Sequence, residues 1–289
     1  MTAKKAVPDL AKRHRKRLRS HFGFSCAPFS KYMRADQMFD SSGQRDLIAG
    51  LGMWLEIAGI AVVTGPSGVG KSIALRRFVQ SLDASTHTVI TFSYLPTTVT
   101  GFLRSLNRKL GLPMRAHTAD LFDQAQRHLA TQADDHGAHP IVLIDDAEGL
   151  PVAVIDALRR LTCWDMDGED RFSVLLSGTD DLLQAMRHPV LAPLRSRVVY
   201  AQHLKPFTAE DARNYVRFHL ERAAVAPEIF SDEATKKVFL ASRGTPRSIN
   251  QLATQAIIEA AVRGRDVIDG DFMVHLIANH PLYHKGTGA

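Results

Sequence analysis

One eight-residue run constrains this chain more than any other feature of its sequence. The run fits the pattern G-x-x-x-x-G-K-[ST] at every fixed position, and it consists of Gly65, Pro66, Ser67, Gly68, Val69, Gly70, Lys71 and Ser72. It follows the apolar residues 60–64, which predict a buried strand, and it opens a segment of helical spacing over residues 71–82. In that setting, backbone N–H groups and the positive end of a helix dipole surround an anion. We therefore predict a nucleotide-binding loop in an α/β fold.

A second motif supplies the acid that such a loop requires. We expect Lys71 to reach the β- and γ-phosphates of ATP and Ser72 to bind Mg²⁺. The apolar residues 141–144 predict a strand that ends in Asp145 and Asp146. Asp145 is predicted to hold Mg²⁺ directly or through water. Asp146 is expected to polarise the attacking water, with a plain cap of the following helix as the alternative.

Two hydroxyl groups and three arginines complete the candidate site. Ser177 and Thr179 lie at the end of a further predicted strand, where either hydroxyl can sense the γ-phosphate or orient water; capping of the next helix by Thr179 or Asp180 is the alternative. Arg195 or Arg197 is predicted to stabilise the transferring phosphate of a neighbouring chain, although surface arginines are common. Arg247 lies in the first turn of a predicted helix, where a cation opposes the helix dipole, so we expect a functional role.

Apolar strands alternate with amphipathic helices over the first two thirds of the chain. Each strand is apolar on both faces, which predicts a parallel sheet covered by helices on two sides, a three-layer α/β arrangement. From Lys205 onward only helices are predicted, and we place a domain boundary at Pro206. The predicted strands cover residues 60–64, 88–94, 141–144, 172–177 and 198–202, and the predicted helices cover residues 41–58, 71–82, 100–111, 118–132, 151–163, 208–223, 231–242, 246–263 and 269–279.

This pattern divides the chain into four predicted segments. They are a basic arm over residues 1–21, an α/β nucleotide-binding domain over 22–204, a small helical lid domain over 205–280 and a tail over 281–289. Two cysteines are too few for a disulfide framework and favour a reducing cytoplasm. The most apolar stretch, residues 47–63, is broken by Glu56 and three glycines, so no membrane span is predicted.

The net charge of +6 is concentrated at the N-terminus. Residues 1–20 hold eight Lys and Arg against the single acid Asp9, whereas the other 28 basic and 29 acidic residues nearly cancel. Such an arm attracts the phosphate backbone of duplex DNA, although a merely solubilising terminus has the same composition. Basic residues within 102–112 fit either a second DNA patch or an ordinary solvated face. The candidate DNA contacts are Lys12, Arg13, Arg15, Lys16, Arg17, Arg104, Arg108 and Lys109.

The order of these motifs resembles AAA+ ATPases over roughly residues 22–265. Within that class the chain is similar to the transposition-helper ATPases of the TnsC, TniB, IstB and MuB types, and to the ATPase domain of the secretion protein ExeA. The run Gly244–Asn250 is the most discriminating similarity, and Pro28-Phe29 and Leu158–Thr162 add to it. The resemblance implies phosphate and Mg²⁺ binding by Lys71 and Ser72, a Walker B pair of Asp145 and Asp146, sensor 1 at Ser177 or Thr179, a finger at Arg197 or Arg195, and sensor 2 at Arg247.

One residue departs from the pattern of that class. Asp146 stands where the class usually has Glu, and its shorter side chain predicts slow, partner- or DNA-stimulated hydrolysis unless Glu148 contributes. Slow turnover would suit a switch that persists on DNA.

The resemblance implies an ATP-dependent oligomer, a ring or filament on duplex DNA with little sequence preference, that regulates or targets a transposase. ExeA-type proteins continue into a membrane segment and a cell-wall-binding domain, and the sequence ends at Ala289 with neither, which favours the transposition-helper branch. The alternatives are a secretion or envelope-assembly ATPase without nucleic acid, and an ATP-gated scaffold with little hydrolysis.

Overall fold

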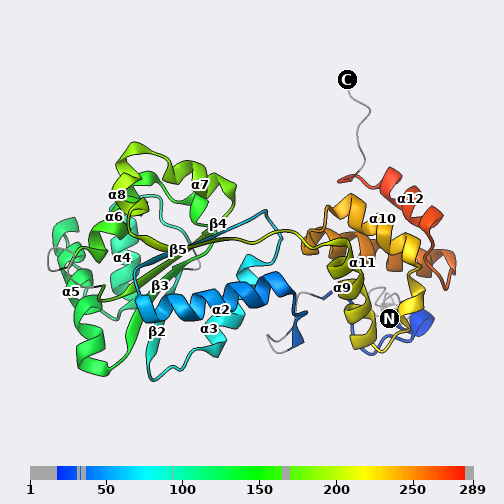
Figure 1. The fold of residues 1–289 in the computed structure, drawn as a ribbon, viewed down its shortest axis with the longest axis horizontal. Coiled ribbons are helices and arrows are strands. Elements are labelled where there is room, and N and C mark those ends of the chain that lie inside the picture. Colours follow the sequence, from blue (N-terminus) through cyan, green and yellow to red (C-terminus); the bar gives the residue numbers. More distant parts are fainter. Residues whose placement is uncertain (1–17, 31–32, 34–36, 93, 165–169, 284–289) are drawn as a thin grey trace, which may run out of the picture. The chain divides into compact units, whose positions relative to one another are not determined.

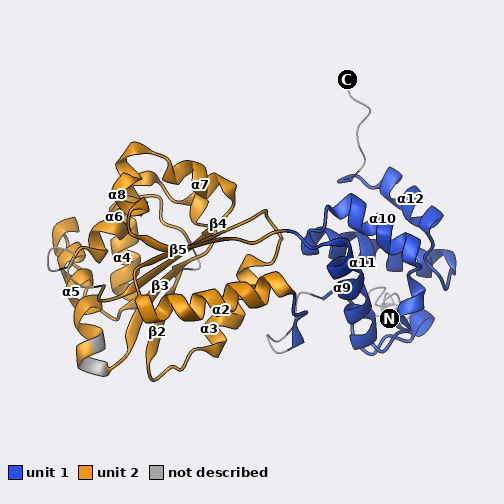
Figure 2. Ribbon diagram, viewed as in Figure 1, with its two compact units in different colours: residues 1–41, 206–289 blue, residues 42–205 orange. Residues whose placement is uncertain are grey.

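The computed structural model divides into two compact units, which are described separately below (Figure 2). It describes residues 18–30, 33, 37–92, 94–164 and 170–283. One unit comprises residues 42–205 and combines a sheet with helices. The other comprises residues 1–41 and 206–289 and is built of helices in its described part. The boundary between Lys205 and Pro206 is the position at which the sequence pattern changes from alternating strands and helices to helices alone.

The α/β unit is organised around one five-stranded sheet. The strand order is β2-β3-β4-β1-β5, and every neighbouring pair runs parallel, as the sequence predicts. The carboxyl ends of all five strands therefore lie at one edge, where loops collect ligands in open α/β sheets. The strands are β1 (Ile60–Thr64), β2 (His87–Thr91), β3 (His139–Ile144), β4 (Ser173–Gly178) and β5 (Val198–His203).

Helices cover both faces of this sheet, which confirms the predicted three layers (Figure 1). Side chains alternate along a strand, so Ile60 and Val62 pack with α4 to α8, whereas Ala61 and Val63 pack with α2 and α3. The helices of the unit are α2 (Ser42–Ile57), α3 (Lys71–Ser81), α4 (Val99–Lys109), α5 (Thr118–His136), α6 (Val152–Thr162), α7 (Asp180–Met186) and α8 (Ala192–Arg195), with short 3₁₀ turns η2 (Ala147–Gly149) and η4 (Pro189–Leu191).

Strand ends differ from the sequence prediction by more than one residue at two places. The strand predicted over residues 88–94 ends at Thr91, and Tyr94 is 75% exposed, so the apolar character of that residue does not reflect burial in the sheet. β3 begins at His139, two residues earlier than predicted. Pro140 therefore lies within the strand, although it has no N–H to donate. No helix in the described part of the chain combines the length and apolar character that a membrane crossing requires.

In the part of the helical unit that the structure describes, helices α9 to α12 pack around a core of their own. Side-chain caps explain several of the helix starts. At the start of α9 the Thr208 hydroxyl accepts from Asp211 N, and the Asp211 carboxylate accepts from Thr208 N, which together form a capping box. The helices are α9 (Ala209–Arg222), α10 (Asp232–Ser242), α11 (Pro246–Arg263) and α12 (Gly270–Asn279), with the 3₁₀ turn η5 (Pro227–Ile229).

The segment after the basic arm packs differently from the prediction that placed residues 22–204 in one domain. Phe24 and Phe29 are buried in the core of the helical unit, and the Phe29 ring lies 5.0 Å from that of His219 on α9. Ser25 N also donates to Ala223 O at 2.9 Å. The described residues between 22 and 41 therefore belong with the helical unit, because Phe24 and Phe29 have their apolar partners there.

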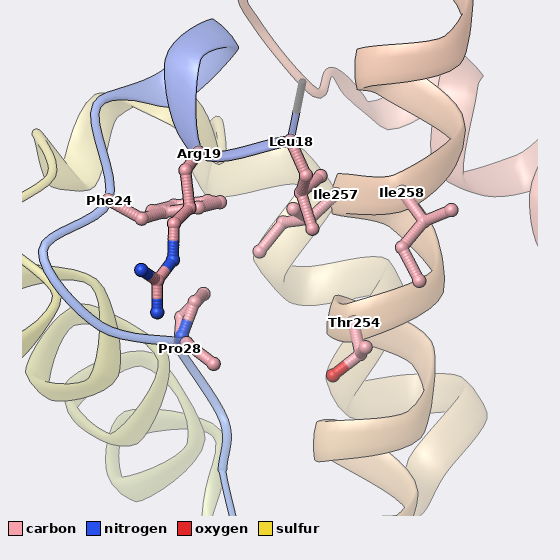
Figure 3. A pocket seen from close by; sticks show the side chains of 8 residues that line it. Leu18, Arg19, Phe24, Pro28, Thr254, Ile257 and Ile258 are labelled. Atoms are coloured by element: carbon pink, nitrogen blue, oxygen red, sulfur yellow. The ribbon is translucent and has the colours of Figure 1, made fainter. Parts of the chain in front are cut away.

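A small hollow remains where this segment meets α11 (Figure 3). It has a volume of about 310 Å³, and Figure 3 shows Arg19 beside Phe24 and Pro28 on one side. The α11 residues Thr254, Ile257 and Ile258 line the other side. At the end of the unit, the Tyr283 hydroxyl donates to Gln251 Oε1 at 2.7 Å, so part of the predicted tail contacts α11.

Candidate nucleotide-binding site

The loop between β1 and α3 has a backbone that only glycine tolerates at its first position. Gly65 has φ 149°, and a Cβ atom there would lie 2.4 Å from Leu204 O, the residue that follows β5. Gly68 and Gly70 also have positive φ angles, 80° and 110°. Glycine adopts such angles without steric cost, so the loop can turn sharply at these three positions.

Lys71 is the first residue of α3, and it is buried although it carries a charge. Its Nζ atom donates to Gly65 O at 2.7 Å and to Pro66 O at 3.2 Å, so the ammonium group lies against the loop that it follows. The next residue, Ser72, is exposed at the start of the helix. A cation and a helix N-terminus thus meet at the loop, and both favour an anion there.

The strand neighbours β3 and β4 bring the two predicted acidic and hydroxyl motifs together. Their register pairs Ile144 with Leu176, so Asp145 and Ser177 come next on the two chains. Ser177 Oγ donates to Asp145 Oδ1 at 2.8 Å, and Asp146 N donates to the same oxygen at 3.1 Å. Both bonds use Oδ1, so Oδ2 would be the oxygen available to a metal ion. Ser177 therefore orients the carboxylate predicted to hold Mg²⁺.

Asp146 leaves this strand in a left-handed conformation, with φ 54°. It is exposed and directly precedes the turn η2. The helix α6 begins only at Val152, and Pro151 occupies its N-cap position. The alternative that Asp146 caps the predicted helix over residues 151–163 is therefore not realised in the structure, because the turn η2 separates Asp146 from the start of that helix.

Thr179 occupies the N-cap position of α7, yet its hydroxyl makes no capping hydrogen bond. Its Oγ1 atom is buried and has no partner among the described residues. The capping alternative for Thr179 is therefore not realised in the structure either. The β1–β4 register pairs Gly178 with Thr64, so Thr179 follows the strand end that adjoins the start of the phosphate-binding loop.

The three arginines occupy different surroundings. Arg195 Nη1 donates to Met186 O and to His188 O, the latter at 3.2 Å, so Arg195 satisfies carbonyl groups at the end of α7. Arg197 is partly exposed and directly precedes β5. Arg247 is the second residue of α11 and is exposed in the helical unit. The finger and sensor roles of these arginines remain predictions.

Two residues beside the loop were not singled out from the sequence. His203, at the end of β5, places Nδ1 3.2 Å from Thr64 Oγ1 and 3.5 Å from Asp180 Oδ1. Gln44 of α2 is buried, and its Nε2 atom would lie 2.7 Å from a Cβ atom at Gly70. The position of His203 at the carboxyl end of a predicted strand was the available signal, whereas nothing local in the sequence indicates Gln44.

The basic residues predicted to contact DNA fall into two sets. Arg104, Arg108 and Lys109 are exposed on α4, and Lys109 Nζ lies 5.5 Å from the centre of the Phe92 ring. The arm residues lie outside the described part of the chain; they are Lys12, Arg13, Arg15, Lys16 and Arg17.

The residues present fit a nucleotide with its magnesium ion. Val69 N donates to Pro66 O at 3.2 Å, but the N–H groups of Gly68 and Gly70 have no backbone acceptor within the described ranges. Unpaired N–H groups in a turn of this kind bind phosphate oxygens. A hydroxyl and a carboxylate, from Ser72 and Asp145, are the hard oxygen ligands that Mg²⁺ takes beside phosphate and water.

The sheet order and the loop after β1 together have the arrangement of the P-loop AAA+ fold. Residues 56–186 match the family model described as AAA domain. General secretion pathway protein A of Aeromonas hydrophila is 32% identical over 271 residues, which cover 92% of this chain and 49% of the relative. The chain thus spans about half the length of that curated relative.

Several solved structures share this fold at low sequence identity. Cdc6p from Pyrobaculum aerophilum has a TM-score of 0.63 at 17% identity, covering 83% of this chain and 67% of that one. The Aeropyrum pernix ORC2 protein has a TM-score of 0.61 at 16% identity, covering 87% and 71%. The Aeropyrum pernix ORC1 protein in complex with DNA has a TM-score of 0.56 at 16% identity, covering 81% and 63%. At these identities the likeness concerns the fold.

Proposed function

We propose that this chain binds and hydrolyses Mg-ATP and acts as a nucleotide-dependent switch in an assembly of several copies. The observation that carries the proposal is the hydrogen bond from Ser177 to Asp145 at the carboxyl ends of β4 and β3. β4 also adjoins β1, which leads into the loop that contains Lys71. An oriented carboxylate beside a loop with a buried lysine is the arrangement that phosphoryl transfer requires.

Each side chain then has a defined task. The Lys71 ammonium exchanges two loop carbonyls for phosphate oxygens, and the N–H groups of Gly68 and Gly70 donate to the same anion. Ser72 and Asp145 hold the metal ion, while Ser177 keeps the carboxylate in place. When bound, Mg²⁺ neutralises charge on the phosphates. Asp146 accepts the proton of the attacking water.

Phosphate release by the purified chain with Mg-ATP tests this proposal, with Asp146→Asn as the diagnostic variant. We expect Asp146→Asn to lose at least about tenfold in rate while it still binds ATP, since one general base contributes on that scale or more. Lys236→Ala, an exposed change in the helical unit, is the control. A slow rate that Asp146→Asn does not alter would favour the ATP-gated scaffold.

For the cellular role we propose assembly of a secretion or envelope complex. The 32% identity to General secretion pathway protein A, over nearly the whole of this chain, supports it. This relation gives more weight to the envelope alternative than to the transposition-helper expectation. The proposal predicts that ATP drives self-association, with Arg197 of one copy acting on the nucleotide of the next.

The second candidate role is an ATP-dependent oligomer on duplex DNA that controls a transposase. It is favoured by the exposed α4 face of Arg104, Arg108 and Lys109. Binding to a long labelled duplex at moderate salt, with an ATP analogue or ADP, decides between the roles. Binding with the analogue alone, abolished when these three residues become Gln, would establish the DNA role. The matched control removes the same charge from the helical unit, by Gln at Arg213, Lys236 and Lys237. No binding under any nucleotide would leave the envelope role.

A further inference from the structure

The end of α2 and the start of β5 present apolar side chains to solvent. Met53 and Ile57 lie one helical turn apart on α2, and they are 71% and 68% exposed. A Cβ atom at Gly59 would lie 3.2 Å from Val199 Cγ2, so Val199, which is also exposed, adjoins the end of that helix. Clustered apolar side chains on a surface mark contacts with other molecules. We call Met53, Ile57 and Val199 the α2 patch.

Two carboxylates border the α2 patch. Glu56 is exposed on the last turn of α2, and Asp170 Oδ2 would lie 3.3 Å from the same Cβ position at Gly59. Arg197 directly precedes β5, so it belongs to the same end of the sheet. The proposed function directs this arginine to the nucleotide of the next copy. The α2 patch is therefore continuous with a surface at which a second copy is already expected.

A groove in the helical unit has the complementary properties. It is formed by α10, α12 and the residues next to them, and it has a volume of about 850 Å³ (Figure 1). Its exposed apolar lining residues are Leu240, Val274 and Leu282. The charged side chains that line it are the cations Lys237 and Arg243, and no carboxylate lines it in the part of the chain that the structure describes. We call this hollow the α10–α12 groove.

Arg243 has an unusual backbone conformation for a residue with a side chain. It ends α10 with φ 52°, in the left-handed region. Glycine is the usual residue at such a helix end, because a Cβ atom crowds the backbone there. The termination of α10 therefore does not explain an arginine at this position. An unfavourable conformation of this kind indicates that the side chain has a use beyond the fold.

We propose that the α10–α12 groove of one copy receives the α2 patch of a second copy. The inference rests on the proposed function, in which several copies assemble. The contact removes the apolar side chains of both surfaces from water, and the carboxylates beside the α2 patch face the cations of the groove. Because the two surfaces differ, the contact is head-to-tail. It therefore repeats from copy to copy and builds a ring or a helical filament.

Two charge-reversal variants test this contact. The groove variant carries Lys237→Glu and Arg243→Glu, and the patch variant carries Glu56→Lys and Asp170→Lys. Each variant by itself sets like charges against each other, so we expect its association constant to fall at least about tenfold. An equimolar mixture should associate again, because the reversed groove of one chain meets the reversed patch of the other. Sedimentation velocity at several protein concentrations measures association, with Mg²⁺ and a non-hydrolysable ATP analogue, with ADP and without nucleotide.

Matched controls separate the contact from general charge and from folding. Lys236→Glu makes the same charge change on α10 at an exposed residue that does not line the groove, and Asp46→Lys does so on α2, away from the α2 patch. Neither should change association. Arg243→Gly should weaken association without lowering the thermal unfolding temperature, because glycine adopts the left-handed conformation freely.

The proposal is overturned if the mixture of the two variants stays dissociated, or if each variant associates as the unchanged chain does. An unchanged chain that stays monomeric at every concentration also overturns it. Association that is alike in all three nucleotide conditions, but is lost in each variant and restored in the mixture, supports the contact and contradicts the nucleotide-dependent switch. Association that requires the analogue and is insensitive to both variants supports the switch and overturns the contact.

Discussion

Lys71 brings a positive charge to the candidate site and Asp145 brings a negative charge, so their replacement should have different effects. Lys71→Ala removes the cation held by Gly65 O and Pro66 O, so we expect ATP binding itself to weaken strongly. Asp145→Asn keeps a partner for Ser177 but removes the negative charge of that side chain from the metal site. We therefore expect ATP to bind while hydrolysis falls by about a hundredfold or more. Nucleotide titration and phosphate release measure the two effects, and equal losses of binding in both variants would contradict this division.

Arg195 and Arg197 can be distinguished by experiment, because Arg195 donates to carbonyl groups at the end of α7. Arg195→Ala should lower stability by about 1 kcal/mol, since charged donors satisfy terminal carbonyls of a helix. Arg197→Ala should reduce hydrolysis in the assembled protein. Urea unfolding and phosphate release at increasing protein concentration measure these outcomes. Loss of hydrolysis in Arg195→Ala at unchanged stability would make Arg195 the finger instead.

At the scale of elements, periodicity predicted most of what the structure contains. The apolar strands and the glycine run placed the sheet and the loop after β1 correctly, because burial on both faces and a strand–turn–helix order are local properties. The pairing of Asp145 with Ser177 follows from the order in which β3 and β4 lie, and no local pattern encodes it. The packing of Phe24 and Phe29 depends on residues about two hundred positions away, so the sequence pattern assigned this segment to the wrong unit.

His219 of α9 makes the stability of the helical unit depend on pH. It is 2% exposed between Phe29 and Tyr215, and burial, with a smaller effect of the Arg222 charge, lowers its pKa to about 4. The unfolded chain has the ordinary histidine pKa near 6.5, so it binds the proton more readily than the folded chain does. Stability is then complete above about pH 6.5 and is lost as pH falls toward 4, by roughly 3 kcal/mol in total.

Urea unfolding at pH 7.5 and pH 5 measures this loss, and His219→Phe should reduce the difference between the two values. His139 of β3 is the matched control, because burial also lowers its pKa but it belongs to the α/β unit. His139→Gln should leave the pH dependence of the helical unit intact. An equal pH dependence in His219→Phe and the unchanged chain would show that another group is responsible.

At the scale of the whole molecule, the net positive charge is concentrated in residues 1–20 of the sequence. Replacing the arm residues Lys12, Arg13, Arg15, Lys16 and Arg17 by Gln removes five positive charges and spares Leu18 and Arg19, which line the hollow beside α11. If the arm binds duplex DNA, affinity should fall and the slope of log affinity against log salt should decrease by about 0.9 for each phosphate that is no longer neutralised. Fluorescence anisotropy over a range of salt concentrations measures the slope. An unchanged slope would assign the arm a solubilising role.

The helical unit is assembled from both ends of the chain, and this has a consequence for biosynthesis. Phe24, Phe29 and Phe39 are made first, but the helices that bury them follow only after the 164 residues of the α/β unit. At translation rates of about 5–20 residues per second, these aromatic side chains remain without their partners for roughly ten to thirty seconds on the ribosome. The nascent chain thus presents an apolar segment that a holdase chaperone can bind, and the last helices synthesised determine when the first residues are buried.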